Sequence, residues 1–216
     1  AFIKMEKTML EELLSRYPSL TACREDIAQA SQMLIDCYRR GGKLLLCGNG
    51  GSCADCEHIV GELMKGFLKK RPLSARKRER MRENWESIDE SLLDKLQCGL
   101  PAISLPSMTA LNTAFCNDVE PELLYAQGVL ALAKEVDVLL CISTSGNAKN
   151  VCAAAEVARA LGVFVLGLTG ETGGRLRALC DCCICVPERE TFKVQELHLP
   201  VYHYLCAETE AYFFEK

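Results

Sequence analysis

The sequence predicts an α/β fold in which a mostly parallel, five-stranded sheet is covered by helices on both faces. Three observations lead to this fold class. Short apolar runs alternate with amphipathic segments, two of these runs end in turns rich in glycine or serine, and 216 residues suffice for one full hydrophobic core. We therefore expect a single domain over residues 1–216.

The chain is expected to begin with two helices, because apolar residues recur at helical spacing over residues 6–16 and 23–40. The second pattern closes on Arg39-Arg40-Gly41-Gly42, a basic last turn followed by glycine that is typical of a helix end. Residues 1–40 thus form a leading helical part. Five strands are expected over residues 43–47, 102–105, 136–142, 163–168 and 182–186. Further helices are expected over residues 53–67, 108–116, 120–133, 148–161 and 191–214.

A polar stretch breaks this rhythm over residues 69–99. It contains Pro72 and a dense set of charges, and its second part, Glu86 to Gln97, has a helical pattern. We interpret it as an insertion between the first two strand units.

Composition excludes several classes of function. The formal net charge is −4, and the basic runs Lys69-Lys70-Arg71 and Arg76 to Arg80 are typical of a solvated surface, which argues against a nucleic-acid partner. No apolar run is long enough to span a bilayer, and Ala1-Phe2-Ile3-Lys4 lacks the layout of a secretory signal. We expect a cytoplasmic protein without a membrane partner.

The fourteen cysteines are expected to be reduced thiols, since a core of this size needs no disulfides. Cys53-Ala54-Asp55-Cys56 has C-x-x-C spacing at the start of a predicted helix, where the helix amino end lowers a thiol pKa. A second cluster, Cys180 to Cys185, enters a predicted strand. A redox or metal function of these thiols stays open as an alternative.

Glycines follow the first predicted strand in Cys47-Gly48-Asn49-Gly50-Gly51-Ser52. Glycine permits positive φ and a close approach of a ligand to the main chain, and the unpaired N–H groups of the following helix favour an anion. Ser52 adds a hydroxyl donor and a candidate N-cap. A tight turn without a ligand would use the same residues.

Hydroxyl groups follow the third predicted strand in Ser143-Thr144-Ser145-Gly146-Asn147. Ligands of open parallel sheets bind beyond the carboxyl ends of strands where the connections diverge, so both turns can face one anion. The alternative, a turn that only caps the next helix, would explain one such segment, but it would have to apply to both turns. We therefore interpret the two turns as one phosphate site.

The chain has three histidines, and their positions suggest chemistry. His58 lies in the helix after the glycine turn with Glu62 four residues later on the same face, a pair that can supply a base or a metal ligand. Gln195 and His203 lie about 80° apart around the last helix and can face one cleft, whereas His198 lies about 140° from His203. Taken singly, each could be a surface pair or a buried core histidine.

These motifs, namely Gly48 to Ser52, His58 with Glu62, Ser143 to Asn147, and Gln195-Glu196 with His203, together resemble the sugar isomerase (SIS) domain proteins of the phosphoheptose isomerase type. The resemblance spans nearly the whole chain. It implies a flavodoxin-like three-layer αβα sandwich that assembles as a homotetramer with active sites at subunit interfaces. It also implies conversion of sedoheptulose 7-phosphate to D-glycero-D-manno-heptose 7-phosphate through a cis-enediol.

The resemblance also implies roles for residues. Glu62 would be the base and His203 the acid, while Asn49 would contact the sugar. The substrate and its phosphate would be bound by Asn49, Gly50, Gly51, Ser52, Ser143, Thr144, Ser145 and Gln195. Some members carry zinc, which here would be bound by His58, Glu62, Gln195 and His203.

The chain departs from the family pattern at three places. Ala148 replaces a serine of the second turn, Thr191 or Phe192 stands where an aspartate precedes the glutamine, and Met108-Thr109 replaces an acidic sugar contact. These changes leave the identity of the sugar open. A non-catalytic phosphosugar-binding or protein-binding regulator of the same family is the alternative, against which the presence of Glu62 and His203 argues.

Overall fold

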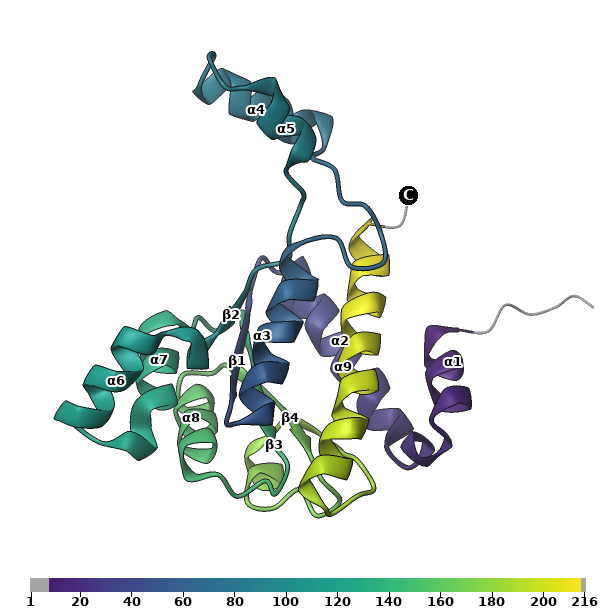
Figure 1. Cartoon of the computed structure of the whole chain (residues 1–216), viewed down its shortest axis with the longest axis vertical. Coiled ribbons are helices and arrows are strands. Elements are labelled where there is room, and N and C mark those ends of the chain that lie inside the picture. The colour runs from purple at the N-terminus through teal and green to yellow at the C-terminus, as the bar shows by residue number, and fades with distance from the viewer. Residues whose placement is uncertain (1–7, 215–216) are drawn as a thin grey trace, which may run out of the picture.

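The computed structural model describes residues 8–214, and its centre is a five-stranded, all-parallel sheet (Figure 1). The strand order β2-β1-β3-β4-β5 places β1 beside β3, the point where the connections diverge to opposite sides. This order confirms the predicted flavodoxin-like fold class. The strands are β1 (Leu44–Gly48), β2 (Ala102–Ser104), β3 (Val138–Ser143), β4 (Phe164–Thr169) and β5 (Cys182–Cys185).

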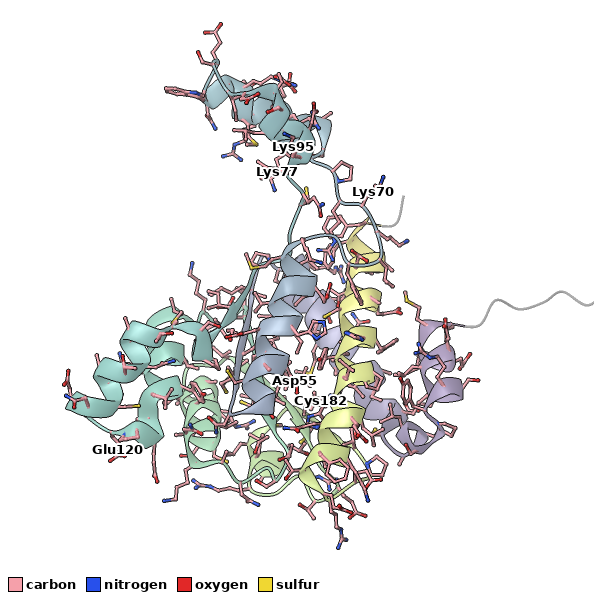
Figure 2. All side chains as sticks on the ribbon, in the orientation of Figure 1. Asp55, Lys70, Lys77, Lys95, Glu120 and Cys182 are labelled. Atoms are coloured by element: carbon pink, nitrogen blue, oxygen red, sulfur yellow. The ribbon has the colours of Figure 1, made fainter. Side chains whose placement is uncertain are left out.

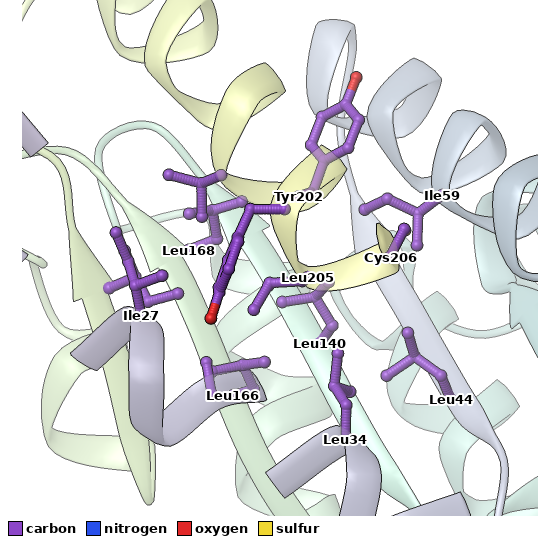
Figure 3. Packing of buried hydrophobic residues seen from close by; sticks show 14 of the residues in the cluster. Ile27, Leu34, Leu44, Ile59, Leu140, Leu166, Leu168, Tyr202, Leu205 and Cys206 are labelled. Carbon is purple, nitrogen blue, oxygen red and sulfur yellow. The ribbon is translucent and has the colours of Figure 1, made fainter. Parts of the chain in front are cut away.

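Both faces of the sheet are buried, because alternate residues of each strand point to opposite sides. Leu44 and Leu46 join the core on one face, and Leu45 and Cys47 join the core on the other. Figure 3 shows the first of these cores, in which Ile59 and Leu205 pack over strand residues. The sheet is thus the middle of three layers.

The helices form the two outer layers. On the Leu44 face lie α1 (Met9–Arg16), α2 (Arg24–Arg39), α3 (Gly51–Met64) and α9 (Thr191–Phe214), and on the other lie α7 (Leu124–Leu132) and α8 (Lys149–Ala160), with α6 (Thr109–Asp118) beside α7. Short 3₁₀ turns occur at η1 (Pro18–Cys23), η2 (Leu105–Ser107), η3 (Pro121–Leu123) and η4 (Leu176–Leu179). The two leading helices were predicted, although residues 6 and 7 of the first prediction, like residues 1–4, lie outside the described residues.

The insertion forms a helical arm, residues 74–96, that projects away from the sheet (Figure 1). The sequence predicted one helix over its second part, but the arm contains two, α4 (Ala75–Asn84) and α5 (Glu90–Lys95). Ser74 caps α4 by accepting the Lys77 N–H, a local signal that the charge density obscured. Lys77 and Lys95 mark the two helices in Figure 2.

Within residues 8–214, no helix combines the length and apolar character that crossing a membrane requires. None of the fourteen cysteines, which all lie within the described residues, is paired in a disulfide.

Candidate active site

The two predicted turns line one cavity of about 320 Å³ beyond the carboxyl ends of β1 and β3. Gly48 pairs with Ile142 across the two strands, so the turns that follow lie side by side. The lining residues are Asn49, Gly50, Gly51, Ser52, Ile142, Ser143, Thr144, Ser145, Ala148, Thr191 and Gln195. The structure therefore brings together the candidate phosphate-binding residues. The same cavity is lined by Ala148 and by Thr191, one of the two residues that could stand in place of the expected aspartate.

Glycine is required at both turns for a physical reason. Gly50 has φ +55°, and Gly146 has φ +67° at a point where an added Cβ would lie only 2.0 Å from the Gly173 carbonyl oxygen. A Cβ on Gly51 would lie 2.4 Å from Gln195 Nε2, so the absence of a side chain there lets Gln195 lie against the first turn of α3.

One local prediction was wrong: Ser52 is not the N-cap of its helix. The helix begins at Gly51 with Gly50 as N-cap, and no side chain caps it. Ser52 lies inside the first turn and is 3% exposed. The N–H groups of Ser52, Cys53 and Ala54 donate to the carbonyl oxygens of Asn49 and Gly50 at 3.0–3.2 Å, so an anion at this helix end would meet the N–H groups of Gly50 and Gly51.

Asn49 is held by two residues that sequence reasoning missed. Tyr125 donates its hydroxyl proton toward the Gly48 carbonyl oxygen at 2.8 Å and Asn49 Oδ1 at 3.0 Å. Asn150 exchanges amide hydrogen bonds with Asn49 at 2.8 and 3.0 Å. Tyr125 and Asn150 lie on helices of the opposite layer, so only the folded sheet brings them to this turn.

His58 joins the two residues predicted to act as base and acid. Its Nε2 lies 3.3 Å from Glu62 Oε1 and 3.4 Å from His203 Nε2. Lys65 Nζ lies 3.2 Å from the other Glu62 oxygen. Burial and the neighbouring His58 lower the pKa of His203, which favours a neutral imidazole near pH 7.

Behind His58 stand two further residues that the sequence did not suggest. His58 Nδ1 lies 2.9 Å from the Tyr202 hydroxyl, which donates to Asp55 Oδ1 at 3.1 Å. Burial and the nearby Asp55 raise the pKa of Tyr202, and burial also raises the pKa of Asp55. Asp55 lies on α3 beside α9 (Figure 2).

The expectation that Gln195 and His203 share one cleft is wrong for a single chain. Gln195 lines the cavity of the two turns, whereas His203 lines a second cavity of about 240 Å³ bounded by α1, α9 and the Phe67-Leu68 segment. The two residues share a helix face, but eight residues separate them by about 12 Å along the axis. His198, which the helix geometry placed about 140° from His203, is buried with 0% exposure.

The candidate zinc ligands do not form a metal centre in this arrangement. The donor types suit zinc, and both contacts of His58 Nε2 are close to the roughly 3.4 Å edge of a tetrahedron with bonds of about 2.1 Å. However, nowhere in residues 8–214 are three or more His, Cys, Asp or Glu side chains placed to hold an ion, and Gln195 lies in the other cavity. The residues as placed do not fit a bound zinc ion.

The carboxyl end of α3, which carries Glu62, is anchored by a buried ion pair. Arg71 Nε lies 2.7 Å from Glu210 Oε1, and both side chains are 0% exposed. Arg71 also donates to the carbonyl oxygens of Leu63 and Glu62 at 2.6 and 3.1 Å. Burial acts to raise the pKa of Glu210, but hydrogen bonds from Phe67 N–H, Arg71 and Leu68 N–H outweigh it and lower the pKa.

The C-x-x-C pair lacks the electrostatics of a reactive thiol. Burial raises the pKa of both Cys53 and Cys56, whereas a redox role needs a lowered pKa. In the second cluster, a hydrogen bond with Cys180 and burial raise the pKa of Cys183 to about 12.

The chain is similar to known proteins in both sequence and fold. Family models described as SIS domain match residues 110–206 and 10–87. Phosphoheptose isomerase from Desulfovibrio desulfuricans is 40% identical over 189 residues, covering 88% of this chain and 78% of the relative. The Helicobacter pylori phosphoheptose isomerase is 36% identical over 212 residues, covering 98% and 97%. The phosphoheptose isomerase structure from Neisseria gonorrhoeae has a TM-score of 0.70 at 28% identity, covering 94% of this chain and all of that one.

Proposed function

The chain belongs to the phosphoheptose isomerase family of SIS-domain proteins, and from that premise we propose that it isomerises sedoheptulose 7-phosphate to D-glycero-D-manno-heptose 7-phosphate. The observation that carries the proposal is that His58, on the helix α3 that starts at the cavity of the two turns, contacts both Glu62 of the same helix and His203 of α9. A carboxylate and a neutral imidazole are the pair that aldose–ketose isomerisation needs.

The proposed reaction moves a carbonyl group between C1 and C2 of the sugar. Glu62 takes a proton from C1 of the ketose, and His203 gives its Nε2 proton to the carbonyl oxygen at C2, which produces a cis-enediol. Glu62 then returns its proton to C2, while His203 recovers a proton from the oxygen on C1. The lowered pKa of His203 supports this role, because a neutral ring can donate and recover a proton in one cycle.

The spacing on α3 supports a long substrate. Gly51 at the cavity and His58 at the acid–base pair lie on one face of the helix, seven residues and therefore about 10 Å apart. An extended chain advances about 1.2 Å per bond, so the eight bonds from C1 to phosphorus of a heptose 7-phosphate span about 10 Å, against about 5 Å for a triose phosphate. Phosphate on the two turns would thus leave C1 and C2 of a heptose near His58.

A direct assay tests this proposal. The protein is incubated with sedoheptulose 7-phosphate and formation of the aldose is followed. Glu62→Gln should lower turnover by about 10²- to 10⁴-fold while phosphate-ligand binding stays within about tenfold. Glu57→Gln, on the same helix with its carboxylate bonded to Ser107, is the matched control and should keep wild-type turnover.

The outcomes separate the candidate functions. No turnover by the wild-type protein on any five- to seven-carbon ketose phosphate removes the enzyme. Stabilisation by the ligand without turnover would favour the phosphosugar-binding regulator. Full activity of Glu62→Gln would mean that the base is a different residue.

We also propose a homotetramer with sites at its interfaces. Leu68 is 66% exposed and Leu199 is 40% exposed, and both border the cavity that His203 lines. Large apolar side chains at the edge of a site favour burial against a second copy. Light scattering coupled to gel filtration measures the assembly, and a monomer active at assay concentration would contradict it.

Zinc binding and a cytoplasmic location stay predictions. Zinc would require Gln195 to move from Gly51 toward the imidazole pair. Metal analysis of the purified protein, compared with His58→Gln, tests whether these residues retain an ion.

A further inference from the structure

Asn49 lines the cavity of the two turns, and its side-chain amide is held by residues from the opposite helical layer. Its Nδ2 donates to Asn150 Oδ1 at 2.8 Å, and its Oδ1 accepts from Asn150 Nδ2 at 3.0 Å. The Tyr125 hydroxyl lies 3.0 Å from the same Oδ1, and Tyr125 is only 5% exposed. The Asn49 amide therefore makes three hydrogen bonds within the protein.

The Val151 N–H decides which end of each amide is the acceptor. A backbone N–H can only donate, and the atom that lies 3.0 Å from it is Asn150 Oδ1. Asn150 Nδ2 is then the donor that meets Asn49, and it requires Asn49 Oδ1 opposite it. Tyr125 agrees with this orientation, because its hydroxyl proton lies between two acceptors, Asn49 Oδ1 and the Gly48 carbonyl oxygen.

This orientation leaves one polar group of Asn49 for a ligand. Oδ1 already accepts from two donors, which matches its two lone pairs, and one Nδ2 proton goes to Asn150. The second Nδ2 proton has no acceptor among residues 8–214, and the side chain lines the cavity. An amide without these partners could turn by 180° and offer its oxygen instead, because the terminal torsion of asparagine is broad and roughly two-fold.

We propose that Tyr125 and Asn150 are positioning residues that keep the Asn49 N–H, rather than its carbonyl oxygen, available in the cavity. Residue 49 then selects an acceptor oxygen at the phosphate end of a bound sugar phosphate, because it directly precedes the glycines of the first turn. Holding the amide in one orientation also removes an ordering cost from binding. The class of ligand rests on the proposed function, but the effect on affinity does not require turnover.

A double-mutant cycle tests the proposal with sorbitol 6-phosphate, a linear sugar phosphate that has no carbonyl group and cannot be isomerised. Calorimetry compares the wild type with Asn49→Ala and with a freed-amide variant that combines Tyr125→Phe and Asn150→Ala. Asn49→Ala should weaken binding about 2- to 12-fold, the range for one hydrogen bond between neutral groups. The freed-amide variant should weaken binding about 2- to 12-fold, since the amide must then be ordered by the ligand, and by no more than Asn49→Ala does.

The third variant carries all of these changes and separates positioning from support of the turn. If the two partners act only through the Asn49 amide, freeing it in the Asn49→Ala background should cause no further loss of affinity. Loss of the Tyr125 bond to the Gly48 carbonyl oxygen occurs in both backgrounds and cancels in the cycle. Asn150→Ala alone, which leaves the buried tyrosine unchanged, should show the same pattern with a smaller factor.

Tyr38→Phe is the matched control, because it removes a tyrosine hydroxyl that donates to the Pro101 carbonyl oxygen outside the cavity, and it should leave affinity unchanged. Full affinity in the freed-amide variant overturns the proposal. An equal loss of affinity with and without the Asn49 side chain also overturns it, since the partners would then act on the shape of the turn. So does a wild type that does not bind sorbitol 6-phosphate. The expected cycle without turnover of sedoheptulose 7-phosphate refutes only the proposed function.

Discussion

Replacing Arg71 by methionine should destabilise the protein strongly, although Arg71 contacts no proposed ligand. Its guanidinium pairs with Glu210 at 2.7 Å where both side chains are fully buried, and it donates to the carbonyl oxygens of Leu63 and Glu62. Methionine fills a similar volume but leaves the Glu210 charge without its counter-ion and removes one hydrogen bond from each of the two carbonyl groups, of which that of Leu63 keeps the Leu100 N–H.

The size of the stability loss follows from the hydrogen bonds that Glu210 keeps in the variant. Breaking one side of a buried ion pair costs about 3–5 kcal/mol, and each lost carbonyl hydrogen bond adds about 1 kcal/mol. Three backbone N–H groups, those of Phe67, Leu68 and Lys69, still donate to Glu210 at 2.7–3.0 Å and offset part of this. We expect a loss of about 4 kcal/mol, which for a chain of this size lowers Tm by about 8–16 °C.

Circular dichroism during thermal and urea unfolding measures the change. Arg78→Met is the matched control, because Arg78 pairs with Asp94 at the surface of the arm at 2.8 Å and should cost less than about 1 kcal/mol. Below the transition, Arg71→Met should also lower kcat, since Arg71 fixes the main chain at Glu62. Equal Tm values for the two variants would refute the reasoning that the buried pair anchors this end of α3.

Three further perturbations have defined outcomes. Burial lowers the pKa of His198 from 6.5 to about 4. The free energy of unfolding of the wild type should therefore fall by about 3 kcal/mol as the pH decreases from 6.5 to 4. Urea unfolding across this pH range should show a smaller loss for His198→Leu. Gly51→Ala should displace Gln195, whose Nε2 would lie 2.4 Å from the new Cβ, and weaken phosphate binding in calorimetry without a comparable change in Tm. Replacing residues 74–96 by a short Gly-Ser linker should change Tm by only a few degrees, because Pro72 and Gln97 already pair at the base of the arm; a collapse of Tm would show that the arm supports the core.

Local sequence patterns were sufficient to predict the sheet and the two turns. The apolar runs that became β1 and β3 end at glycine and serine, and parallel strands place their carboxyl ends together, so one cavity could be expected. His58 and Glu62 could be paired because helical geometry alone sets residues four apart on one face. The helix over residues 75–84 was missed because its cap and ion pairs carry little apolar periodicity.

The partners that complete the site could not be predicted from spacing, because they are distant in the chain. Asp55 lies 147 residues from Tyr202, and Arg71 lies 139 residues from Glu210. No periodic signal marks such pairs: each side chain taken alone is an ordinary helix or loop residue. The contact of Gln195 with the first turn of α3 likewise depends on how α9 is shifted along its axis relative to α3.

By itself, the order of apolar and polar residues determined the α/β class, the two turns that line one cavity and the candidate acid–base side chains, because these depend on backbone conformation and short-range geometry. Only the packing of α3 against α9 decided that His58 touches His203, that Gln195 stays with the turns, and that Tyr202 reaches both Asp55 and His58. Those contacts depend on the relative shift of two helices, which is set by the whole buried layer beneath them.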